Sequence, residues 1–560
     1  MDFDVAVLGA GFPALIVESR RTDSTGTHFE LRLPAFRPGR EFASAKLWLP
    51  KGFPETQKAR IRLSVDAILR IPHVESGGLL CTSGEPGPGA GFSTLERLQI
   101  LLSQYHYEFL VPWLEDELDG DFLKEAQNYW TMEVARCRRQ GDPVVSVLTV
   151  DAAPGRARVI EGVLFLPSRV VVAADKDSPI VRRLMHSLGK RVEQHVRVRI
   201  ADIPISDGFV PSTWPRDAEV LQRLISVRLQ GPDRDEFLRP IRRRQPRVHR
   251  VVVFRSPQGN FGYLLPNGPP TVVRDGKHVR ARPARLQPVP LLVDRIDPDW
   301  TVGRDQHAEV AARQKSRVLV FGAGALGSPV IDHLAKAGVG HITIVDEDEF
   351  APANIGRHLL GVDALHYRKS EAVADRVGRG HPSCSVIPVR TTAESWFQRN
   401  SLDEFDVVVD LTGEPDVRWV VDQARRASPC RLLIGWMEPY VAAAHVCTFP
   451  AGEYWYSNAN NTYDRRLDLE AIEWPKEVIR QEPGCSSRFQ AYTAAQAAYA
   501  VALVAEQAIN LIDGKVFESA VHSWVRGQQF LDKNWPGLSL RDWAENAKPH
   551  DGLIIKRNFI

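Results

Sequence analysis

Along the first 150 residues, hydrophobic and polar positions alternate in short runs. Three of these runs have the period-two spacing of strands and are separated by turns rich in proline and glycine: Phe29–Leu33, Ala45–Leu49 and Ile61–Val65. Ser93 and Glu96 then form a capping-box pattern, and apolar residues recur at helical spacing from Leu95 to Phe109. The pattern predicts an α+β domain over residues 1–150, in which a strand meander leads through a loop into a helix.

From about residue 291 the pattern changes to apolar strands that alternate with helices. The expected strands are Ser316–Phe321, His341–Val345 and Phe405–Asp410, and the expected helices are Ser328–Ala337 and Gln490–Ile512. This alternation predicts an α/β domain with a mostly parallel sheet over residues 291–560. The longest apolar run, Ala494–Ala505, is mostly alanine and is followed by Glu506 and Gln507, so we interpret it as a buried helix and expect no membrane span.

The interval 151–290 carries the weakest pattern. Val159–Leu166 and Val248–Phe254 have strand character, and Arg242–Arg244 with Arg247 and Arg250 form a basic cluster. A solvated face or linker explains such a cluster better than a nucleic-acid patch does. We therefore treat 151–290 as a linker or an uncharacterised α/β region.

Composition narrows the functional classes. A chain of 560 residues predicts roughly three domains, and 71 Lys+Arg against 69 Asp+Glu leave a net charge of +2, which gives no support for direct nucleic-acid binding. Six cysteines without a C-x2-C spacing favour a reducing cytoplasm over a disulfide framework or a zinc site. Residues 1–4 carry no basic charge, so we expect no secretory signal.

The clearest motif is the glycine run GAGALG at residues 322–327. It follows a predicted strand and opens a predicted helix, which is the context that the G-x-G-x-x-G fingerprint of a Rossmann-like nucleotide site requires. Asp346 lies at the end of the next strand, in position for a ribose hydroxyl. A similar run, Val5–Phe12, is followed at once by Pro13 and has no third glycine, so we interpret it as a strand and turn.

The residues that follow favour ATP over NAD. Arg357 and Lys369 provide cations for a triphosphate, and a hydride-transfer enzyme does not need them. Asp410 lies at the end of a strand, where a carboxylate can hold Mg²⁺. Their order along one domain predicts an ATP site with magnesium.

The stretch Arg317–Arg390, with GAGALGS, IVDEDEF, NIGRH and YRKSEA, resembles the adenylation domain of the ubiquitin-activating and ThiF/MoeB family. The resemblance extends from roughly residue 295 to the C-terminus. It implies that ATP and Mg²⁺ are used at the following positions: Gly322, Gly324 and Gly327 in the phosphate loop, Asp346 at the ribose with Asp348 beside it, Asn354, Arg357 and Lys369 at the phosphates, and Asp410 at magnesium. It also implies a homodimer, in which Arg304 reaches the ATP of the neighbouring subunit.

Two short runs depart from the pattern of that family. Where the family has Asn-Arg-Gln, this chain has Gly356-Arg357-His358. Where the family has Thr-Asp-Asn after the magnesium aspartate, this chain has Thr412-Gly413-Glu414. The individual polar contacts to the nucleotide are therefore expected to differ from those of the family.

Two cysteines are candidates for carrying an acyl group. Cys485 lies in a loop before the Ala-rich helix, beside Arg488, and resembles the thioester cysteine of bacterial activating enzymes; Cys430 and Cys447 lie in apolar segments that suit structural cysteines. Cys81 follows Ile71-Pro72-His73, a stretch that resembles the active site of ubiquitin-conjugating enzymes. His73 takes the place of the family's asparagine, and could stabilise the oxyanion by a hydrogen bond.

A conjugating-like domain ahead of an activating-like domain resembles the fused ubiquitin-transfer proteins of bacterial antiphage defence, such as those of CBASS operons. The resemblance implies a protein partner with an exposed C-terminus, either a cGAS-like nucleotidyltransferase or a ubiquitin-like protein, and ligation of that terminus to an amine. Three other classes stay open: a sulfur-carrier adenylyltransferase of the ThiF/MoeB type, an NAD-dependent dehydrogenase, and a non-catalytic scaffold that keeps a nucleotide fold.

Overall fold

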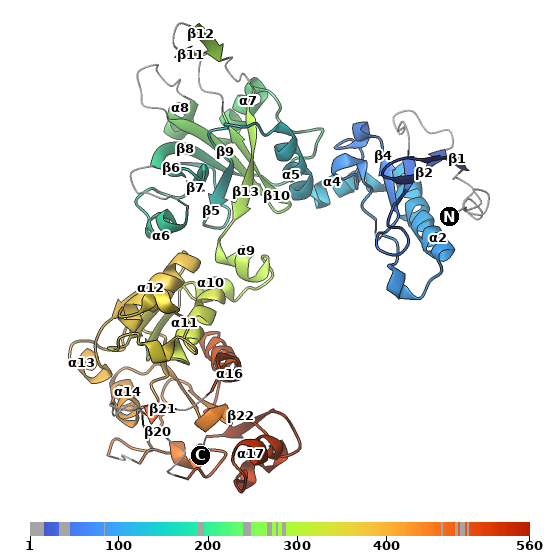
Figure 1. Ribbon diagram of the computed structural model, residues 1–560. Helices are drawn as coiled ribbons and strands as arrows, with labels where there is room; N and C mark the ends of the chain where they lie inside the picture. Colours follow the sequence, from blue (N-terminus) through green and yellow to red (C-terminus); the bar gives the residue numbers. More distant parts are fainter. Residues whose placement is uncertain are drawn as a thin grey trace. The chain divides into compact units, whose positions relative to one another are not determined.

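The computed structural model describes residues 16–32, 45–82, 84–188, 195–238, 248–265, 271–275, 278–282, 287–460, 463–475, 480–481, 488–489 and 492–559. The chain divides into two compact units (Figure 1). The first consists of Met1–Val181 with Leu188–Asp294, and the second of Arg182–Ser187 with Arg295–Ile560. The second unit therefore begins close to the boundary predicted at residue 291.

The first unit opens with an antiparallel meander of four strands in sequence order: β1 (Ile16–Thr22), β2 (Gly26–Arg32), β3 (Ala45–Pro50) and β4 (Arg60–Leu63). Alternate residues of β3 are buried, and these pack with Ile61 and Leu63 of β4 against the helix α2 (Thr94–Gln104). The side chains of Ser93 and Glu96 cap α2 reciprocally, as the sequence predicts. A loop that carries Cys81 joins the meander to α2.

After α2 the chain forms a π-helical turn (Tyr105–Leu110) and three further helices: α3 (Val111–Leu114), α4 (Asp121–Lys124) and α5 (Ala126–Cys137). Helix α5 packs on the barrel that follows. The indole of Trp130 is fully buried and donates a hydrogen bond to the carbonyl of Leu291 (2.9 Å), and its ring contacts Phe261 and Tyr263 edge-on.

The interval that the sequence leaves as a linker or uncharacterised α/β region contains a closed barrel. Its strands are β5 (Ser146–Thr149), β6 (Arg158–Phe165), β7 (Val170–Ala173), β8 (His195–Pro204), β9 (His249–Ser256), β10 (Gly259–Leu264) and β13 (Val289–Arg295), in the order β10-β13-β5-β7-β6-β8-β9. Three helices and a hairpin accompany it: α6 (Pro179–Leu188), α7 (Ala218–Arg228), α8 (Gly231–Leu238), and β11 (Thr271–Asp275) with β12 (His278–Arg282). Arg250 of the predicted basic cluster is buried, whereas its other members lie outside the described residues.

The second unit is built on an eight-stranded sheet in the order β16-β15-β14-β17-β18-β19-β22-β23. Five strands are parallel: β14 (Arg317–Phe321), β15 (His341–Val345), β16 (Ser385–Val389), β17 (Val407–Asp410) and β18 (Arg431–Met437). Three antiparallel strands complete the sheet: β19 (Ala443–Phe449), β22 (Ala520–Val525) and β23 (Leu553–Asn558). The predicted α/β fold is present, and its sheet is mixed.

Helices cover both faces of this sheet because both faces of its central strands are apolar. On one face, Val318, Val320 and Ile344 pack with α11 (Gly327–Lys336), α12 (Lys369–Gly380) and α16 (Ala494–Ile512). On the other, Leu319, Phe321 and Val408 pack with α13 (Ala393–Phe397) and α14 (Pro415–Ala427). The shorter elements are α9 (Pro298–Gly303), α10 (Val310–Arg313), α15 (Arg466–Leu469), α17 (Gln528–Asn534), β20 (Arg480–Gln481) and β21 (Arg488–Phe489).

Helix α16 is, by length and composition, a helix that could cross a membrane. Here it packs against α11, β18 and β19, and residues such as Ala500, Leu503 and Val504 belong to the main core. The structure thus bears out the interpretation of this run as a buried helix. The glycine run near the N-terminus, Val5–Phe12, lies outside the described residues.

Candidate nucleotide and thioester sites

The glycine loop at residues 322–327 connects β14 to α11, as its fingerprint predicts. Gly322 has a φ of +88°, in the left-handed region that favours glycine. A Cβ on Gly327 would lie 2.0 Å from the carbonyl oxygen of Gly322, so only glycine permits the loop to close on itself. Around Gly324 there is open space, and the backbone is accessible where a phosphate would approach.

Asp346 follows β15, and its carboxylate fixes the glycine loop by hydrogen bonding. Its Oδ2 accepts a hydrogen bond from the Ala323 N–H (2.7 Å), and its Oδ1 accepts one from the Asp348 N–H (2.9 Å). Burial raises the pKa of the Asp346 carboxyl, and the two N–H donors oppose this rise. The carboxylate at the predicted ribose position is therefore part of the loop's own framework.

Lys369 and Asp348 form an ion pair at the start of α12. The Lys369 Nζ lies 2.7 Å from the Asp348 Oδ2, and the Lys369 N–H donates to the Asp348 carbonyl (2.9 Å). The lysine is 9% exposed, so its ammonium group is held at the floor of the site. A phosphate that approaches Lys369 would compete with Asp348 for it.

Asp410 ends β17 and is almost completely buried. Its Oδ1 accepts hydrogen bonds from the Thr412 hydroxyl (2.6 Å) and N–H (3.0 Å), whereas its Oδ2 has no hydrogen-bond partner among the described residues. Burial raises the pKa of this carboxyl. An unpartnered buried carboxylate oxygen fits a cation ligand, because an orphaned charge of this kind is otherwise costly.

The segment after β15 carries the other predicted phosphate residues. The Asn354 Oδ1 accepts from the Ala351 N–H (3.0 Å), and the Arg357 guanidinium lies over the ring of Tyr492, 5.4 Å from its centroid. His358, which departs from the family pattern, turns inward: its Nε2 lies 2.6 Å from the Ala323 carbonyl oxygen. Sequence reasoning gave His358 no role, because the loop that it contacts lies 35 residues away.

A cavity of about 450 Å³ lies at the carboxyl ends of the parallel strands. Of the predicted site residues, its lining includes Gly322, Gly324, Asp346, Asp348 and Lys369, and does not include Gly327, Asn354, Arg357 or Asp410. It is lined by Phe321, Gly322, Gly324, Val345, Asp346, Glu347, Asp348, Lys369, Thr391, Thr392, Ala393, Glu394, Leu411, Thr412, Glu414, Asp416 and Val417. Among these lining residues Lys369 is the cation, and six are acids. Sequence reasoning missed the wall from Thr391 to Glu394; the short apolar run that forms β16 just before it was the available signal.

The acidic lining matters for a nucleotide, since a triphosphate is itself strongly negative. Backbone N–H groups and Lys369 offset part of that charge, and a divalent cation would offset more. No group of three His, Cys, Asp or Glu residues in the described part of the chain is placed to hold a metal ion. For the predicted Mg²⁺ at Asp410, phosphate oxygens and water would be the other ligands.

Arg304 lies at the end of α9, outside this cavity's lining. It has a φ of +52°, is exposed, donates a hydrogen bond to the Trp300 carbonyl (2.6 Å) and lies over the Trp300 ring. The residue is thus on the surface of its own unit, as a group that acts on a neighbouring subunit would be.

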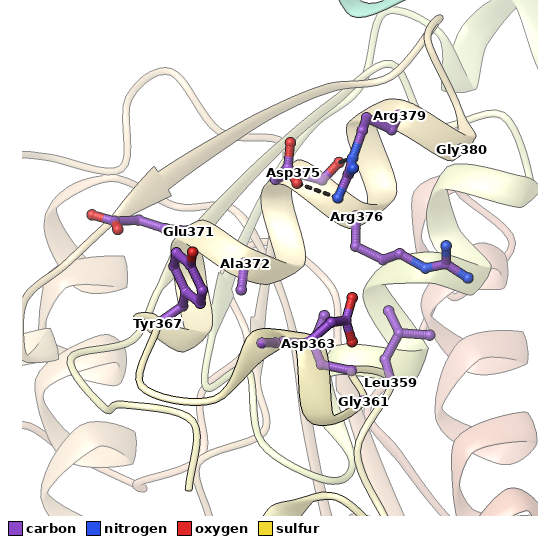
Figure 2. A pocket seen from close by; sticks show the side chains of 12 residues that line it. Leu359, Gly361, Asp363, Tyr367, Glu371, Ala372, Asp375, Arg376, Arg379 and Gly380 are labelled. Carbon is purple, nitrogen blue, oxygen red and sulfur yellow. Dashed lines mark hydrogen bonds and ion pairs between the residues drawn. The ribbon is translucent and has the colours of Figure 1, made fainter. Parts of the chain in front are cut away.

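A second cavity of about 880 Å³ lies along the outer face of α12 (Figure 2). The loop Leu359–Tyr367 forms one side of it, and the α12 side chains of Glu371, Asp375, Arg376 and Arg379 form the other. Arg379 pairs with Asp375 across one helical turn (2.5 Å). The same helix therefore begins in the nucleotide cavity, with Lys369, and continues along a second one.

Cys81 is exposed and lies opposite His73 in a tight hairpin. The Cys81 N–H donates to the His73 carbonyl (2.7 Å), and the bridge between Val74 and Leu80 places His73, Glu75 and Cys81 on one face. Burial, and then the negative charges of Glu75 and Glu125, raise the pKa of the Cys81 thiol. The thiol is therefore kept protonated in its resting state.

The His73 ring is held by carboxylates. Its Nε2 lies 2.9 Å from the Asp121 Oδ2, and its Nδ1 lies 3.7 Å from the Glu125 Oε1. The backbone N–H of His73 donates to the Tyr129 hydroxyl (2.7 Å). An oxyanion role for the ring would require Nε2–H to leave Asp121. Sequence reasoning missed this acidic surround, because Asp121 and Glu125 come from α4 and the start of α5.

The other cysteines differ from Cys81 in exposure. Cys384, Cys430 and Cys447 are buried, and burial raises the pKa of each thiol, which suits packing better than nucleophilic attack. Cys485, the predicted thioester cysteine of the C-terminal unit, lies outside the described residues.

Comparison with known proteins places the nucleotide unit in a family context. Residues 304–524 match the model of the ThiF family. The chain is 28% identical over 279 residues to the ATP-dependent ubiquitin transferase-like protein Cap2 of Pseudomonas aeruginosa, a match that covers 47% of this chain and 49% of that protein. It is 40% identical over 111 residues to the adenylyltransferase and sulfurtransferase UBA4 of Yarrowia lipolytica, covering 20% of this chain and 28% of that protein.

Other similarities concern shorter stretches. The SAMP-activating enzyme E1 of Haloferax volcanii is 33% identical over 121 residues, covering 21% of this chain and 45% of that protein. Among solved structures, E. coli MccB with ATP aligns with a TM-score of 0.30 and 15% identity, over 38% of this chain and 61% of that one. The chain thus spans about half, or less, of the length of the curated relatives named here.

The unpartnered oxygen of Asp410 leads to a first prediction. Because burial raises its pKa, the folded state binds a proton more tightly than the unfolded state, and stability falls as the pH rises above the unfolded-state pKa. Asp410→Asn removes the buried charge, so its melting temperature at pH 7 should be at least that of the wild type. The affinity of this variant for ATP, measured by calorimetry, should no longer increase when Mg²⁺ is added. Asp416→Asn, at an exposed residue of the nucleotide cavity, is the matched control; a Mg²⁺ effect that persists in Asp410→Asn would remove Asp410 from the site.

The acids around Cys81 lead to a second prediction. Glu75→Gln removes one of the charges that raise the thiol pKa, so alkylation of Cys81 by iodoacetamide at pH 7.5 should become faster. Peptide mass spectrometry gives the rate at Cys81 alone. Glu55→Gln, an exposed acid outside the cluster, should leave that rate unchanged. A slower or unaltered rate in Glu75→Gln would contradict the electrostatic assignment.

Proposed function

Since residues 304–524 form a ThiF-family domain, in a chain similar to a bacterial Cap2 over about half its length, we propose that this protein is an ATP-dependent ubiquitin-transferase-like enzyme. It adenylates the C-terminal carboxylate of a protein, carries the acyl group as a thioester, and ligates it to an amine. The observation that carries the proposal is the nucleotide cavity at the ends of β14, β15 and β17, in which Asp346 holds the glycine loop and Lys369 lies at the floor.

The first step is transfer of the adenylyl group of ATP to the carboxylate of the protein substrate. A carboxylate oxygen of the protein substrate attacks the α-phosphorus of ATP, a new C(O)O–P bond forms, and the bond to pyrophosphate breaks. The loop N–H groups near Gly324 and the ammonium of Lys369 stabilise the charge on the phosphates, and Asp346 orients the ribose.

Asp410 is the residue that would hold magnesium, through its unpartnered Oδ2. It is buried, and it directly precedes Leu411 and Thr412, which line the nucleotide cavity. Thr412 binds Oδ1 and leaves Oδ2 without a partner among the described residues. The cation would neutralise phosphate charge beside a lining that carries six acids.

The next steps use thiols. Cys485 attacks the carbonyl of the acyl adenylate, a C–S bond forms, and AMP leaves with the oxygen. Cys81 then attacks this thioester, the acyl group passes to Cys81, and the Cys485 thiol is regenerated. The support for Cys81 is its exposure, in the loop between a four-stranded meander and α2, which is the arrangement expected of a conjugating-like domain over residues 1–150. An amine finally attacks the Cys81 thioester and forms the amide.

The partners follow from this chemistry. We propose that the carrier is a protein with an exposed C-terminus, a cGAS-like nucleotidyltransferase or a ubiquitin-like protein, and that the reaction serves antiphage defence in the cytoplasm. The named similarity to Cap2 supports this setting. We further propose a homodimer of the ThiF-family units, in which Arg304 completes the neighbouring ATP site; its exposure on α9 supports this role.

A sulfur-carrier adenylyltransferase is the second candidate. Its support is the local identity to UBA4, which is higher than the identity to Cap2 but covers only 20% of this chain. Such an enzyme needs the nucleotide cavity and has no use for a thioester on Cys81. The two functions therefore differ in one measurable intermediate.

The proposed relay predicts different intermediates for two variants. With ATP, Mg²⁺ and a cGAS-like nucleotidyltransferase or ubiquitin-like protein as carrier, Cys485→Ala should form the adenylate but no thioester on either cysteine. Cys81→Ala should accumulate a reducible thioester on Cys485 and form no amide. Non-reducing gels and mass spectrometry separate these species, with Cys137→Ala as the control for loss of a thiol elsewhere. Amide formation by Cys81→Ala would refute the Cys81 step. Adenylate formation by the wild type with no thioester on Cys81 and no amide would favour the sulfur-carrier alternative.

The proposed dimer predicts complementation between two inactive variants. Arg304→Ala lacks the group given to the neighbour, and Asp410→Asn lacks the magnesium ligand of its own site. A mixed dimer contains one site with both groups intact, so mixing should restore adenylate formation that neither variant shows alone. Full activity of Arg304→Ala by itself, or no recovery on mixing after subunit exchange is verified by native mass spectrometry, would defeat the shared-site model.

A further inference from the structure

The ring of His358 joins two parts of the chain that are distant in sequence. Its Nε2 lies 2.6 Å from the carbonyl oxygen of Ala323, in the glycine loop. Its Nδ1 accepts a hydrogen bond from the Leu360 N–H (3.1 Å). Because one neighbour is a carbonyl and the other an N–H, both contacts form only when the ring is neutral and carries its proton on Nε2.

The Ala323 peptide is therefore held on both sides. Its N–H donates to Asp346 and its carbonyl accepts from His358. One residue further on, the Leu359 N–H donates to the hydroxyl of Ser328, a fully buried residue in the first turn of α11 (3.2 Å). The segment 358–360 is thus fastened to the glycine loop and to α11.

The segment 358–360 follows the predicted phosphate-binding side chains in the chain. Asn354 and Arg357, the predicted phosphate side chains, lie immediately before His358. The glycine loop supplies the backbone N–H groups. A triphosphate must be reached by both sets at once, so their separation has to be fixed before the nucleotide arrives.

We propose that His358 is a positioning residue for the triphosphate: it fastens the segment that carries Asn354 and Arg357 to the glycine loop, so that both face the same ligand. This inference rests on the proposed ATP site and adds to it a residue at which the chain departs from its family's glutamine. His358 does not contact the nucleotide; it acts through the Ala323 carbonyl.

The His358 ring stays neutral, and so keeps both hydrogen bonds, at physiological pH. Burial, opposed by the hydrogen bond to Ala323 and helped by the nearby charge of Lys369, lowers the pKa of His358 to about 4. The ring also packs edge-on against Phe350, with 5.0 Å between the ring centroids, and this contact fixes the plane of the imidazole. The neutral Nε2–H form is therefore the resting state, and the contact does not switch between pH 6 and 8.

The test compares nucleotides that differ only in phosphates. ATP and adenosine binding to the full chain are measured by calorimetry for the wild type, His358→Leu, which keeps bulk without hydrogen bonds, and His358→Gln, which keeps a donor and an acceptor. His333→Gln is the matched control, because His333 is an exposed histidine on α11. The affinity for adenosine measures the base and ribose part of the site, and we expect substitutions of His358 not to change it.

The expected result is selective. His358→Leu should weaken ATP binding about tenfold, as the loss of one or two hydrogen bonds implies, and change adenosine binding by less than about threefold. His358→Gln should recover most of the ATP affinity. Equal losses for ATP and adenosine, an unchanged ATP affinity in His358→Leu, or a Gln variant as weak as the Leu variant would each overturn the inference.

A second measurement observes the wild-type ring directly and needs only one folded variant for assignment. In protein with ¹⁵N-labelled histidine, the His358 ring, assigned by its absence from whichever of His358→Gln and His358→Leu folds, should give the shifts of a neutral Nε2–H ring from pH 6 to 8. An imidazolium or an Nδ1–H ring would refute the geometry. A wild type that binds no ATP would instead refute the proposed function, so the two failures are distinguishable.

Discussion

The nucleotide unit depends on one contact, the hydrogen bond from the Ala323 N–H to the Asp346 carboxylate. It joins the ends of two adjacent parallel strands, β14 and β15, and thereby sets where the glycine loop lies relative to the sheet. The other parts of the site are arranged from this point: Asp348 is positioned by the second oxygen of Asp346 and in turn holds Lys369. The carboxylate at the predicted ribose position is thus also a structural element of the glycine loop.

Much of this unit could be predicted from the sequence because the determining interactions are local. A strand, three glycines and a helix follow one another within a few residues, and Gly322 and Gly327 are required by the backbone of that turn alone. The ends of β15 and β17 are local in the same sense, which is why Asp346 and Asp410 could be placed. The role of His358 could not, because its partner is a carbonyl in a loop 35 residues earlier, and no periodicity encodes that pairing.

The barrel of the first unit was beyond sequence reasoning for a related reason. β5 and β7 pair in parallel and are separated in the chain by β6, and β8 and β9 pair in parallel and are separated by α7 and α8. Sequence reasoning identified only Val159–Leu166 and Val248–Phe254 as strands, since β5 and β7 are runs of four residues, too short to show a period.

The acids near Cys81 were hidden likewise, since Glu75 lies six residues from the thiol but Asp121 and Glu125 come from a different part of the fold. A resting thiol among carboxylates is a weak nucleophile. In the proposed relay, such a thiol needs an activated acyl donor, and a thioester is a donor of this kind.

The stretch from Arg357 to Lys369 has a further consequence. Lys369, at its end, lines the nucleotide cavity, while its middle, Leu359 to Tyr367, forms a wall of the cavity along α12 (Figure 2). A small molecule seated in the cavity along α12 would press on a segment whose ends are the predicted phosphate-binding cations. Such a compound would act as an inhibitor that does not compete with ATP, and a high cellular nucleotide concentration would not displace it. Its selectivity would come from Tyr367, Arg376 and their neighbours, and not from the glycine loop that so many nucleotide-binding proteins share.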